Sequence, residues 1–211
     1  MIAIDGPAGA GKSTIARLLA DRLGLEYLDT GAMYRAITSE ALHTGVAVDS
    51  TELVARIAET AVLRVDRDSV VVNGRDVTSD IRSSAVTAAV SAVAANPAVR
   101  AAMGSHQRRW GLEHGGGVLE GRDIGTVIFP DAALKVFLTA SPRVRAQRRV
   151  AEVGGDVAQM EASIAERDHR DSSRETSPLA EADDSVVIDT SDMTLDEVVE
   201  LIASLFAERT T

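Results

Sequence analysis

The chain has 211 residues, of which 45% are hydrophobic and 26% are charged, a composition typical of a globular protein with one packed core. Its formal net charge of −10 argues against broad binding to nucleic acid, and the absence of cysteine excludes disulfides and thiolate metal sites. The sequence contains neither a leader-like segment nor an apolar run of membrane-spanning length, so we expect a cytoplasmic protein that binds no membrane.

The first predicted elements surround a glycine-rich loop. Residues 1–4, "MIAI", are expected to form a buried strand, and residues 13–23 an amphipathic helix. Between them, residues 6–13 read "GPAGAGKS" and match the phosphate-loop pattern G-x-x-x-x-G-K-[ST]. In such a loop the backbone N–H groups face a phosphate, and the N-terminus of the helix adds a positive partial charge. Lys12 would then reach the β- and γ-phosphates of a nucleoside triphosphate, and the Ser13 hydroxyl would join the shell of a Mg²⁺ ion. The nucleotide-binding residues that this motif predicts are Gly6, Pro7, Ala8, Gly9, Ala10, Gly11, Lys12, Ser13 and Thr14.

Strands and helices alternate along the rest of the chain, which predicts an α/β fold with a parallel sheet and helices on both faces. The expected strands are 25–29, 118–121, 134–140 and 185–190, and a small hairpin with an Asn-Gly turn is expected within 62–78. The expected helices are 33–45, an Ala/Val-rich helix that runs to about residue 109, 142–175 with an interruption at 154–155, and an amphipathic helix over 195–206.

A triphosphate site is shared by GTPase switches, mechanical ATPases and small-molecule kinases. The guanine-reading motif N-K-x-D is absent, since neither Lys12 nor Lys135 follows an asparagine and the chain has no other lysine. A mechanical ATPase would be expected to have a larger body or an obvious interaction surface. The remaining class is phosphoryl transfer to a small acceptor.

Two stretches carry residues suited to an acceptor. "LDTGAMYRA" places Arg35 one helical turn after the end of a strand. "LEGRDIGTVIFPDA" leaves Arg122 and Asp123 just beyond the carboxyl end of a strand, the edge at which open α/β sheets bind their ligands. An Arg–Asp pair offers the donors and acceptors that a nucleobase edge requires, although an ion pair in a surface turn is the alternative interpretation.

A third stretch, "IAERDHRDSSRETSPL", is rich in arginine. At about 100° per residue, a helix would bring Arg167, Arg170, Asp171 and Arg174 within an arc of roughly 100°. Three arginines on one face repel one another unless an anion lies before them. The alternative is a solvated helix face in which the flanking acids form salt bridges.

Together these motifs resemble the bacterial cytidylate kinases, which phosphorylate CMP and dCMP with ATP. The pieces "IDGPAGAGKST", "LDTGAMYRA", "GRDIGTVIFPDA" and "ERDHRDSSRETSPL" stand in the order and spacing of that family and span almost the whole chain. The resemblance implies a five-stranded parallel sheet core with the phosphate loop, an inserted acceptor-binding (NMP) domain and a small lid. The implied regions of this single kinase domain are a core over 1–30, 106–145 and 161–211, an acceptor-binding insert with the hairpin over 31–105, and a lid over 146–160.

The resemblance also implies roles for individual residues. Cytosine would be read by Ser91, Arg100 and Asp123, with Thr30 nearby at a position where other members have serine. The CMP phosphate would be held by Arg35, Arg122 and Arg174, and the sugar hydroxyls by Arg167 and Asp171, while Tyr34 belongs to the same acceptor site. Lys12, Arg122 and Arg174 would act in catalysis, and Arg145, Arg148 and Arg149 would belong to the lid. Beyond Ser13, the Mg²⁺ partner would be Asp29 or Glu120, directly or through water.

The implied reaction is transfer of the γ-phosphate of ATP to CMP or dCMP, in line and without a covalent intermediate, with Mg²⁺ as cofactor and no nucleic acid as partner. We expect the enzyme to act as a monomer. Two alternatives remain open from the residues. One is a kinase for another small acceptor, such as UMP, shikimate or dephospho-coenzyme A, and the other is a nucleotide-binding regulator without turnover.

Overall fold

The computed structural model describes residues 1–210, which divide into two compact units. Unit 1 contains residues 1–27 and the chain from residue 114 onward, and unit 2 contains residues 28–113. Because the chain leaves unit 1 and later returns to it, unit 2 is an insertion into unit 1.

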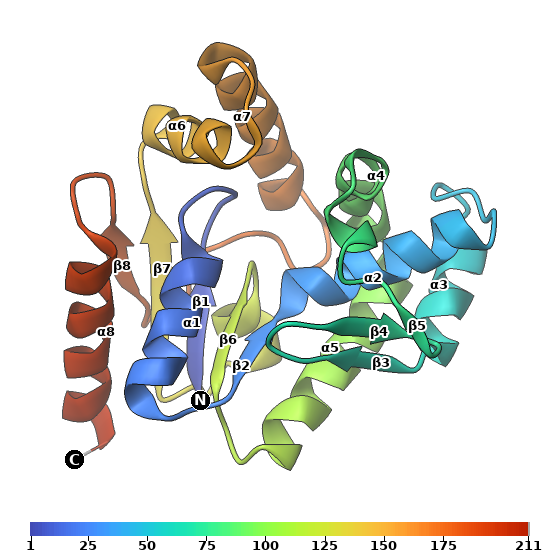
Figure 1. The fold of residues 1–211 in the computed structure, drawn as a ribbon. Coiled ribbons are helices and arrows are strands. Elements are labelled where there is room, and N and C mark those ends of the chain that lie inside the picture. Colours follow the sequence, from blue (N-terminus) through green and yellow to red (C-terminus); the bar gives the residue numbers. More distant parts are fainter. Residues whose placement is uncertain (211) are drawn as a thin grey trace. The chain divides into compact units, whose positions relative to one another are not determined.

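Unit 1 is built on a parallel sheet with the strand order β2-β6-β1-β7-β8 (Figure 1). The strands are β1 (Ile2–Asp5), β2 (Tyr27–Asp29), β6 (Val118–Gly121), β7 (Leu134–Thr139) and β8 (Val186–Asp189), and the chain passes from unit 1 to unit 2 within β2, after Tyr27. β1 pairs in parallel with both β6 and β7, and β7 pairs in parallel with β8. A central strand is covered on both faces, which explains why the apolar run at the start of the sequence is uninterrupted. The predicted fold class, an α/β fold with a five-stranded parallel sheet, is confirmed.

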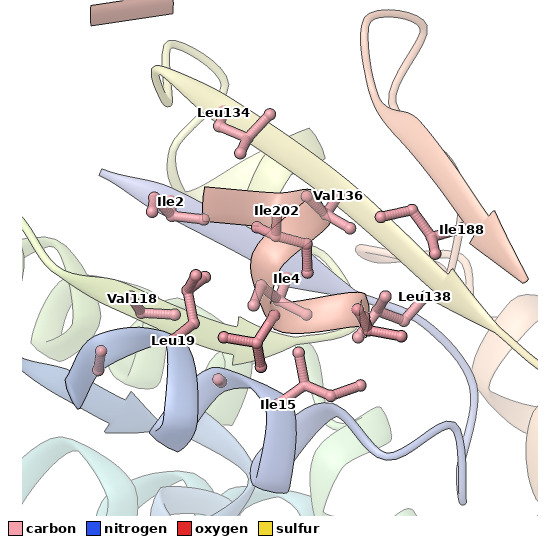
Figure 2. Close-up of a cluster of buried hydrophobic side chains, with 14 of the residues drawn as sticks. Ile2, Ile4, Ile15, Leu19, Val118, Leu134, Val136, Leu138, Ile188 and Ile202 are labelled. Carbon is pink, nitrogen blue, oxygen red and sulfur yellow. The ribbon is translucent and has the colours of Figure 1, made fainter. Parts of the chain in front are cut away.

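The hydrophobic core of unit 1 lies between one face of this sheet and the two helices α1 (Lys12–Leu23) and α8 (Leu195–Thr210). Alternate residues of the strands point into it, as the two-residue period of a strand requires. Figure 2 shows side chains of the sheet and of both helices meeting in this layer, among them Ile2, Ile4, Leu134, Val136 and Leu138 from the strands, Ile15 and Leu19 from α1 and Ile202 from α8. Burying each such side chain contributes about 1.5–3 kcal/mol.

The intervening strand residues face the other side of the sheet, where the short helical segment η2 (Ile124–Ile128) packs against β1 and β6. Asp5 of β1 accepts hydrogen bonds from the N–H groups of Ile124 and Gly125. The buried Lys135 of β7 lies beneath the same segment, since a β-carbon on Gly125 would come within 3.2 Å of its side chain. Helical elements therefore cover both faces, as predicted.

Two helices that pack against each other, α6 (Pro142–Val153) and α7 (Val157–Ser172), lie beyond the carboxyl ends of β1 and β7 (Figure 1). The predicted interruption is present, because Gly154 and Gly155 adopt φ values of 76° and 109° between the helices. The predicted extension of helix to residue 175 is wrong. α7 ends at Ser172 because the carbonyl of Asp171 accepts from the N–H of Leu179, 2.9 Å away, instead of continuing the helix. The helical arc proposed for Arg174 is therefore wrong as well.

Unit 2 is mainly helical. Its helices are α2 (Thr30–His43), α3 (Thr51–Thr60), α4 (Ser84–Ala95) and α5 (Pro97–Glu113), with a single turn η1 (Asp80–Arg82). The predicted Ala/Val-rich helix is two helices, because Asn96 caps α5 by accepting from the N–H of Ala98 at 3.0 Å and proline begins the new helix. α3 was not predicted. α2 begins at Thr30, three residues earlier than predicted, because the carboxylate of Asp29 caps the N–H of Ala32 at 2.9 Å.

A small antiparallel sheet completes unit 2. Its strands are β3 (Leu63–Val65), β4 (Val70–Val72) and β5 (Arg75–Asp76). The Asn73–Gly74 turn has φ values of 51° and 80°, which are typical of a two-residue hairpin, so the predicted hairpin is confirmed and β3 adds a third strand to it.

Within residues 1–210, no single helix has the length and hydropathy that a membrane span needs; α4 and α5 pass such a test only when taken as one bent pair.

Candidate functional site

The phosphate-loop motif forms a tight curl between β1 and α1. Gly6 has φ 148°, and a β-carbon there would lie 2.0 Å from the carbonyl oxygen of Leu138, so the loop begins pressed against β7. Gly11 precedes α1 with φ 85°, a conformation that glycine adopts readily. The loop therefore ends at the N-terminus of a twelve-residue helix, where N–H groups and the helix dipole favour an anion.

Lys12 is buried at the start of this helix, and its ammonium group donates to the carbonyl oxygen of Pro7 at 2.8 Å. Burial lowers the pKa of Lys12 to about 7, with a further contribution from the positive charge of Arg122, while the carboxylate of Glu120 acts in the opposite direction. A phosphate bound in the loop would stabilise the ammonium form of Lys12 and raise its pKa.

Two of the predicted magnesium partners, Ser13 and Glu120, lie in unit 1 and carry side-chain oxygens, the ligand type that magnesium prefers. Ser13 is exposed at the N-terminus of α1, and Glu120 is buried at the end of β6, where it accepts from the Tyr27 hydroxyl at 2.9 Å. Among residues 1–210, no group of three or more His, Asp or Glu side chains is arranged to hold a metal by itself. Magnesium is commonly bound by one or two protein oxygens together with substrate phosphates, so these residues suit an ion that a nucleotide completes. Asp29, the other predicted partner, caps α2.

Three predicted acceptor residues of unit 1 form one ion-pair cluster, which we call the acceptor cluster: Arg122, Asp171 and Arg174. The Arg122 Nε donates to Asp171 Oδ2 at 2.9 Å, and an Arg174 Nη lies 3.0 Å from Asp171 Oδ1. Arg174 also donates through Nε to the backbone carbonyl of Asp171 at 3.1 Å. Burial opposes ionisation of Asp171, but the charges of Arg122, Arg174 and Arg167 outweigh it and lower its pKa. Arg122, 49 positions before Asp171, and Arg174, three positions after it, are thus brought together around one ionised carboxylate.

Asp123 follows Arg122 and is buried, with 5% of its surface exposed. The loop that carries it is fixed by Asp5, which the sequence analysis did not include. Asp5 Oδ1 accepts from the N–H of Ile124 at 2.9 Å and Oδ2 from the N–H of Gly125 at 2.7 Å. Burial raises the pKa of Asp5 to about 6, although these two hydrogen bonds act against the rise.

The predicted acceptor residues of unit 2 have their own supports. An Arg35 Nη donates to the carbonyl oxygen of Ile81 at 2.9 Å and to the Thr87 hydroxyl at 3.1 Å, which joins α2 to η1 and α4. Arg100 is buried, with its guanidinium carbon 5.4 Å from the centre of the Tyr34 ring, a cation–π contact.

Arg100 also donates to the carbonyl oxygen of Ala94 at 3.1 Å. Thr30 is buried at the first position of α2, and Ser91 is half-buried on α4. The roles of these residues in reading cytosine stay predictions.

The predicted lid arginines lie on α6 and are all engaged. Arg145 is buried and paired with Asp168, Arg148 donates to the Thr190 hydroxyl at 3.0 Å and to its carbonyl, and Arg149 pairs with Glu152 at 2.8 Å. Their role in a lid stays a prediction.

Arg170 differs from its neighbours in the arginine-rich stretch. Half of its side chain is exposed, and it lies 3.8 Å from Glu166 on the same helix. Arg170 therefore fits the alternative interpretation of this stretch, a solvated helix face on which arginines pair with flanking acids.

Three residues with clear contacts were missed by sequence reasoning: Asp5, Tyr27 and Asp168. Asp5 carried a signal, because a charged residue at the end of an otherwise apolar buried strand requires partners. Tyr27 and Asp168 lie in ordinary amphipathic contexts, so their contacts with Glu120 and Arg145 could not be read from spacing alone.

The chain was compared with protein families and curated proteins. The family model described as cytidylate kinase matches residues 2–208. A cytidylate kinase of Rhodococcus opacus (strain B4) is 46% identical over 218 residues, covering 99% of this chain and 95% of that protein. A bifunctional pantoate ligase/cytidylate kinase of Synechococcus sp. (strain CC9311) is 49% identical over 220 residues, covering 99% of this chain and 44% of that protein. The chain thus spans less than half the length of the bifunctional relatives that it matches.

Solved structures share the fold at low sequence identity. A gluconokinase from Sinorhizobium meliloti 1021 superposes with a TM-score of 0.52 at 15% identity, covering 98% of this chain and 91% of that one. An uncharacterized protein from Eubacterium ventriosum gives a TM-score of 0.54 at 15% identity, covering 98% and 97%. At these identities the likeness extends to the fold alone.

Proposed function

The chain belongs to the cytidylate kinase family, and from this premise we propose that it transfers the γ-phosphoryl group of ATP to CMP, giving CDP and ADP. We propose dCMP as a second acceptor. The family membership covers nearly the whole chain, so the proposal rests on more than the phosphate loop, which many nucleotide-binding proteins share.

The observation that carries the proposal is the pairing of a phosphate loop with the acceptor cluster in one unit. The charges of Arg122, in the acceptor cluster, and of Arg167, on the same helix as Asp171, both lower the pKa of Lys12. The cations on the acceptor side therefore lie close enough to the phosphate loop to affect its lysine. Cations so placed repel one another in the absence of substrate. Two anionic substrates that exchange a phosphoryl group supply the charge that such a site requires.

The proposed reaction is a single in-line displacement. An oxygen of the CMP phosphate attacks the γ-phosphorus of ATP, a new P–O bond forms, and the bond from the γ-phosphorus to the β,γ-bridging oxygen breaks as ADP leaves. The acceptor phosphate is already a nucleophile, so no covalent enzyme intermediate is required and catalysis consists of positioning and charge stabilisation.

Each group of residues has one task in this scheme. Lys12 and the N–H groups of the loop hold the donor phosphates, and Arg122 and Arg174 hold the acceptor phosphate once their shared carboxylate, Asp171, turns toward the sugar hydroxyls. Asp123 and Arg100 read the cytosine edge.

Ser13 and Glu120 would hold a Mg²⁺ ion, with Asp29 as an alternative to Glu120. Bound with ATP, Mg²⁺ neutralises charge on the β- and γ-phosphates. The Tyr27 hydroxyl donates to Glu120 Oε1, a contact that orients this carboxylate at the end of β6.

The proposal is tested by measuring ADP release with Mg²⁺ and ATP against CMP, dCMP, UMP, AMP and dTMP, each compared with a reaction without acceptor. We expect CMP to give the largest kcat/KM and acceptor-free hydrolysis to be slower by orders of magnitude. A larger kcat/KM for UMP or for another acceptor would refute the cytidylate assignment. ATP binding without acceptor-dependent ADP release would favour the non-catalytic regulator instead.

A further inference from the structure

The phosphate loop is held by a carboxylate that the proposed reaction does not use. Asp168, on α7, accepts from the backbone N–H of Ala8 through Oδ1 at 3.0 Å. Its other oxygen, Oδ2, pairs with the guanidinium group of Arg145, on α6. Both helices lie next to this loop in unit 1 (Figure 1).

Arg145 closes the contact from the other side. Its Nη1 donates to the carbonyl oxygen of Ala8 at 3.0 Å and its Nε to the carbonyl oxygen of Ala140 at 3.0 Å. The N–H and C=O of Ala8 are therefore both engaged, so this residue is fixed and the phosphate is left to the N–H groups that follow it.

The loop also packs tightly against α6. A β-carbon on Gly9 would lie 3.1 Å from the β-carbon of Arg145 and 3.2 Å from its carbonyl oxygen. The loop is thus held by hydrogen bonds at Ala8 and by close packing at the next residue, Gly9.

The electrostatics of this clamp depend on Asp168. The side chain of Arg145 is 8% exposed, and a buried guanidinium group is costly unless an anion compensates it. Asp168 supplies that charge at the point where it also accepts from the loop. Removal of the carboxylate charge would leave Arg145 buried and uncompensated beside Ala8.

The same helix carries residues assigned to the acceptor. Arg167 precedes Asp168, and Asp171, one turn later, belongs to the acceptor cluster. We propose that Asp168 is a positioning residue that clamps the donor loop through Ala8 and Arg145 and ties it to the helix that contacts the acceptor. This inference rests on the proposed function for the identity of the donor and acceptor.

The test is the Asp168→Asn variant, with Glu166→Gln as the matched control on the exposed side of the same helix. The asparagine oxygen can still accept from Ala8, but its NH₂ group confronts the Arg145 guanidinium, and both are donors. We expect the dissociation constant for MgATP, measured by calorimetry without acceptor, to rise about tenfold or more. KM for CMP at saturating ATP should change by less than about threefold, and Glu166→Gln should leave both constants unchanged.

A second measurement reports on the clamp directly. The Ala8 amide, donating to a carboxylate, should exchange its hydrogen slowly in the wild type and at least about tenfold faster in Asp168→Asn. A wild-type exchange rate in the variant would overturn the proposal, and so would an unchanged ATP affinity.

If Asp168→Asn proves too unstable to measure, the double variant Asp168→Ala with Arg145→Met removes both buried charges and both side-chain hydrogen bonds to Ala8. It should fold and still bind MgATP about tenfold more weakly than the wild type. Wild-type affinity in the double variant would overturn the proposal. Failure of the CMP assignment itself would appear differently, as normal ATP binding with no CMP-dependent turnover in the wild type.

Discussion

Lys12 carries its charge at a position where burial disfavours it. The charges of Arg122 and Arg167 act on it, and its ammonium group donates to the loop carbonyl of Pro7. A bound triphosphate would stabilise the ammonium form of Lys12. The pKa of Lys12, lowered in the nucleotide-free chain, should therefore rise when ATP binds.

This pairing predicts a pH dependence of ATP binding. The nucleotide-free chain has Lys12 with a pKa of about 7, and bound phosphates raise that pKa, so MgATP should bind with proton uptake. We expect the dissociation constant to increase by up to about tenfold per pH unit between about pH 7.5 and about pH 9. Calorimetry in two buffers of different ionisation enthalpy measures both the affinity and the proton uptake.

Lys12→Ala provides the control for that experiment. It should remain folded, lose turnover by about two orders of magnitude or more, and bind ATP with little dependence on pH over the same range. An equally steep pH dependence in the variant would assign the proton to another group.

Asp123 offers a test of base specificity. A carboxylate can accept from the 4-amino group of cytosine, whereas uracil presents a carbonyl oxygen there and is repelled. Asp123→Ala should therefore lower kcat/KM for CMP by about tenfold or more while affecting UMP less, so the CMP:UMP ratio falls. A ratio equal to that of the wild type would show that Asp123 does not read the base.

At the scale of elements, the loop after β6 is held in position by hydrogen bonds to Asp5 at the end of β1. Its N–H groups at Ile124 and Gly125 do not find partners within the loop and donate to Asp5 at the end of β1. Because the phosphate loop begins at the next residue, Gly6, one carboxylate joins the donor loop to the segment that carries Arg122 and Asp123. The alignment of the two loops depends on this bond.

Asp5→Asn should disturb that alignment. An asparagine oxygen can accept only from one side, and its NH₂ group would face the second N–H, leaving a buried donor unsatisfied. We expect a loss of about 1–3 kcal/mol in the free energy of unfolding and a decrease of about tenfold in kcat/KM for CMP.

The exposed Asp183 provides the same chemical change without those contacts. Asp183→Asn should leave the denaturation midpoint and kcat/KM at their wild-type values. If Asp5→Asn also keeps wild-type values, the hydrogen bonds from Ile124 and Gly125 to Asp5 are not required for stability or for activity.

At the scale of the molecule, unit 1 owes its stability to a layer in which segments from both ends of the chain meet. α1 follows the first strand and α8 closes the sequence, yet their side chains pack over the same face of the sheet (Figure 2). The residues between them include the whole of unit 2. The platform for the phosphate loop is therefore complete only when the C-terminal helix is in place.

This layer predicts that a substitution far from the site destabilises the chain without altering its chemistry. Ile202→Ala removes a fully buried side chain of α8 and should cost about 2–5 kcal/mol, lowering the melting temperature by roughly 5–15 °C. Leu201→Ala, at a neighbouring side chain that is 39% exposed, should lower it much less.

The measurement is thermal unfolding together with kcat at 25 °C, where both variants should retain activity within about twofold. Equal melting temperatures for the two variants would show that α8 does not close the core.

The sequence by itself determined the strand order along the chain, most of the helices and the chemistry of the loop, although α3 and the break between α4 and α5 were missed. A buried apolar strand, a phosphate-loop motif and an amphipathic helix are local patterns, and so is the Asn-Gly turn of the hairpin, which is why each could be predicted from neighbouring residues. Only the tertiary structure decided which distant charges meet. Asp171 lies between Arg122 and Arg174, although the helix ends before Arg174, and Asp168 reaches Ala8, 160 residues earlier. Contacts of this kind depend on the packing of helices against the sheet edge, and no spacing within a single segment encodes them.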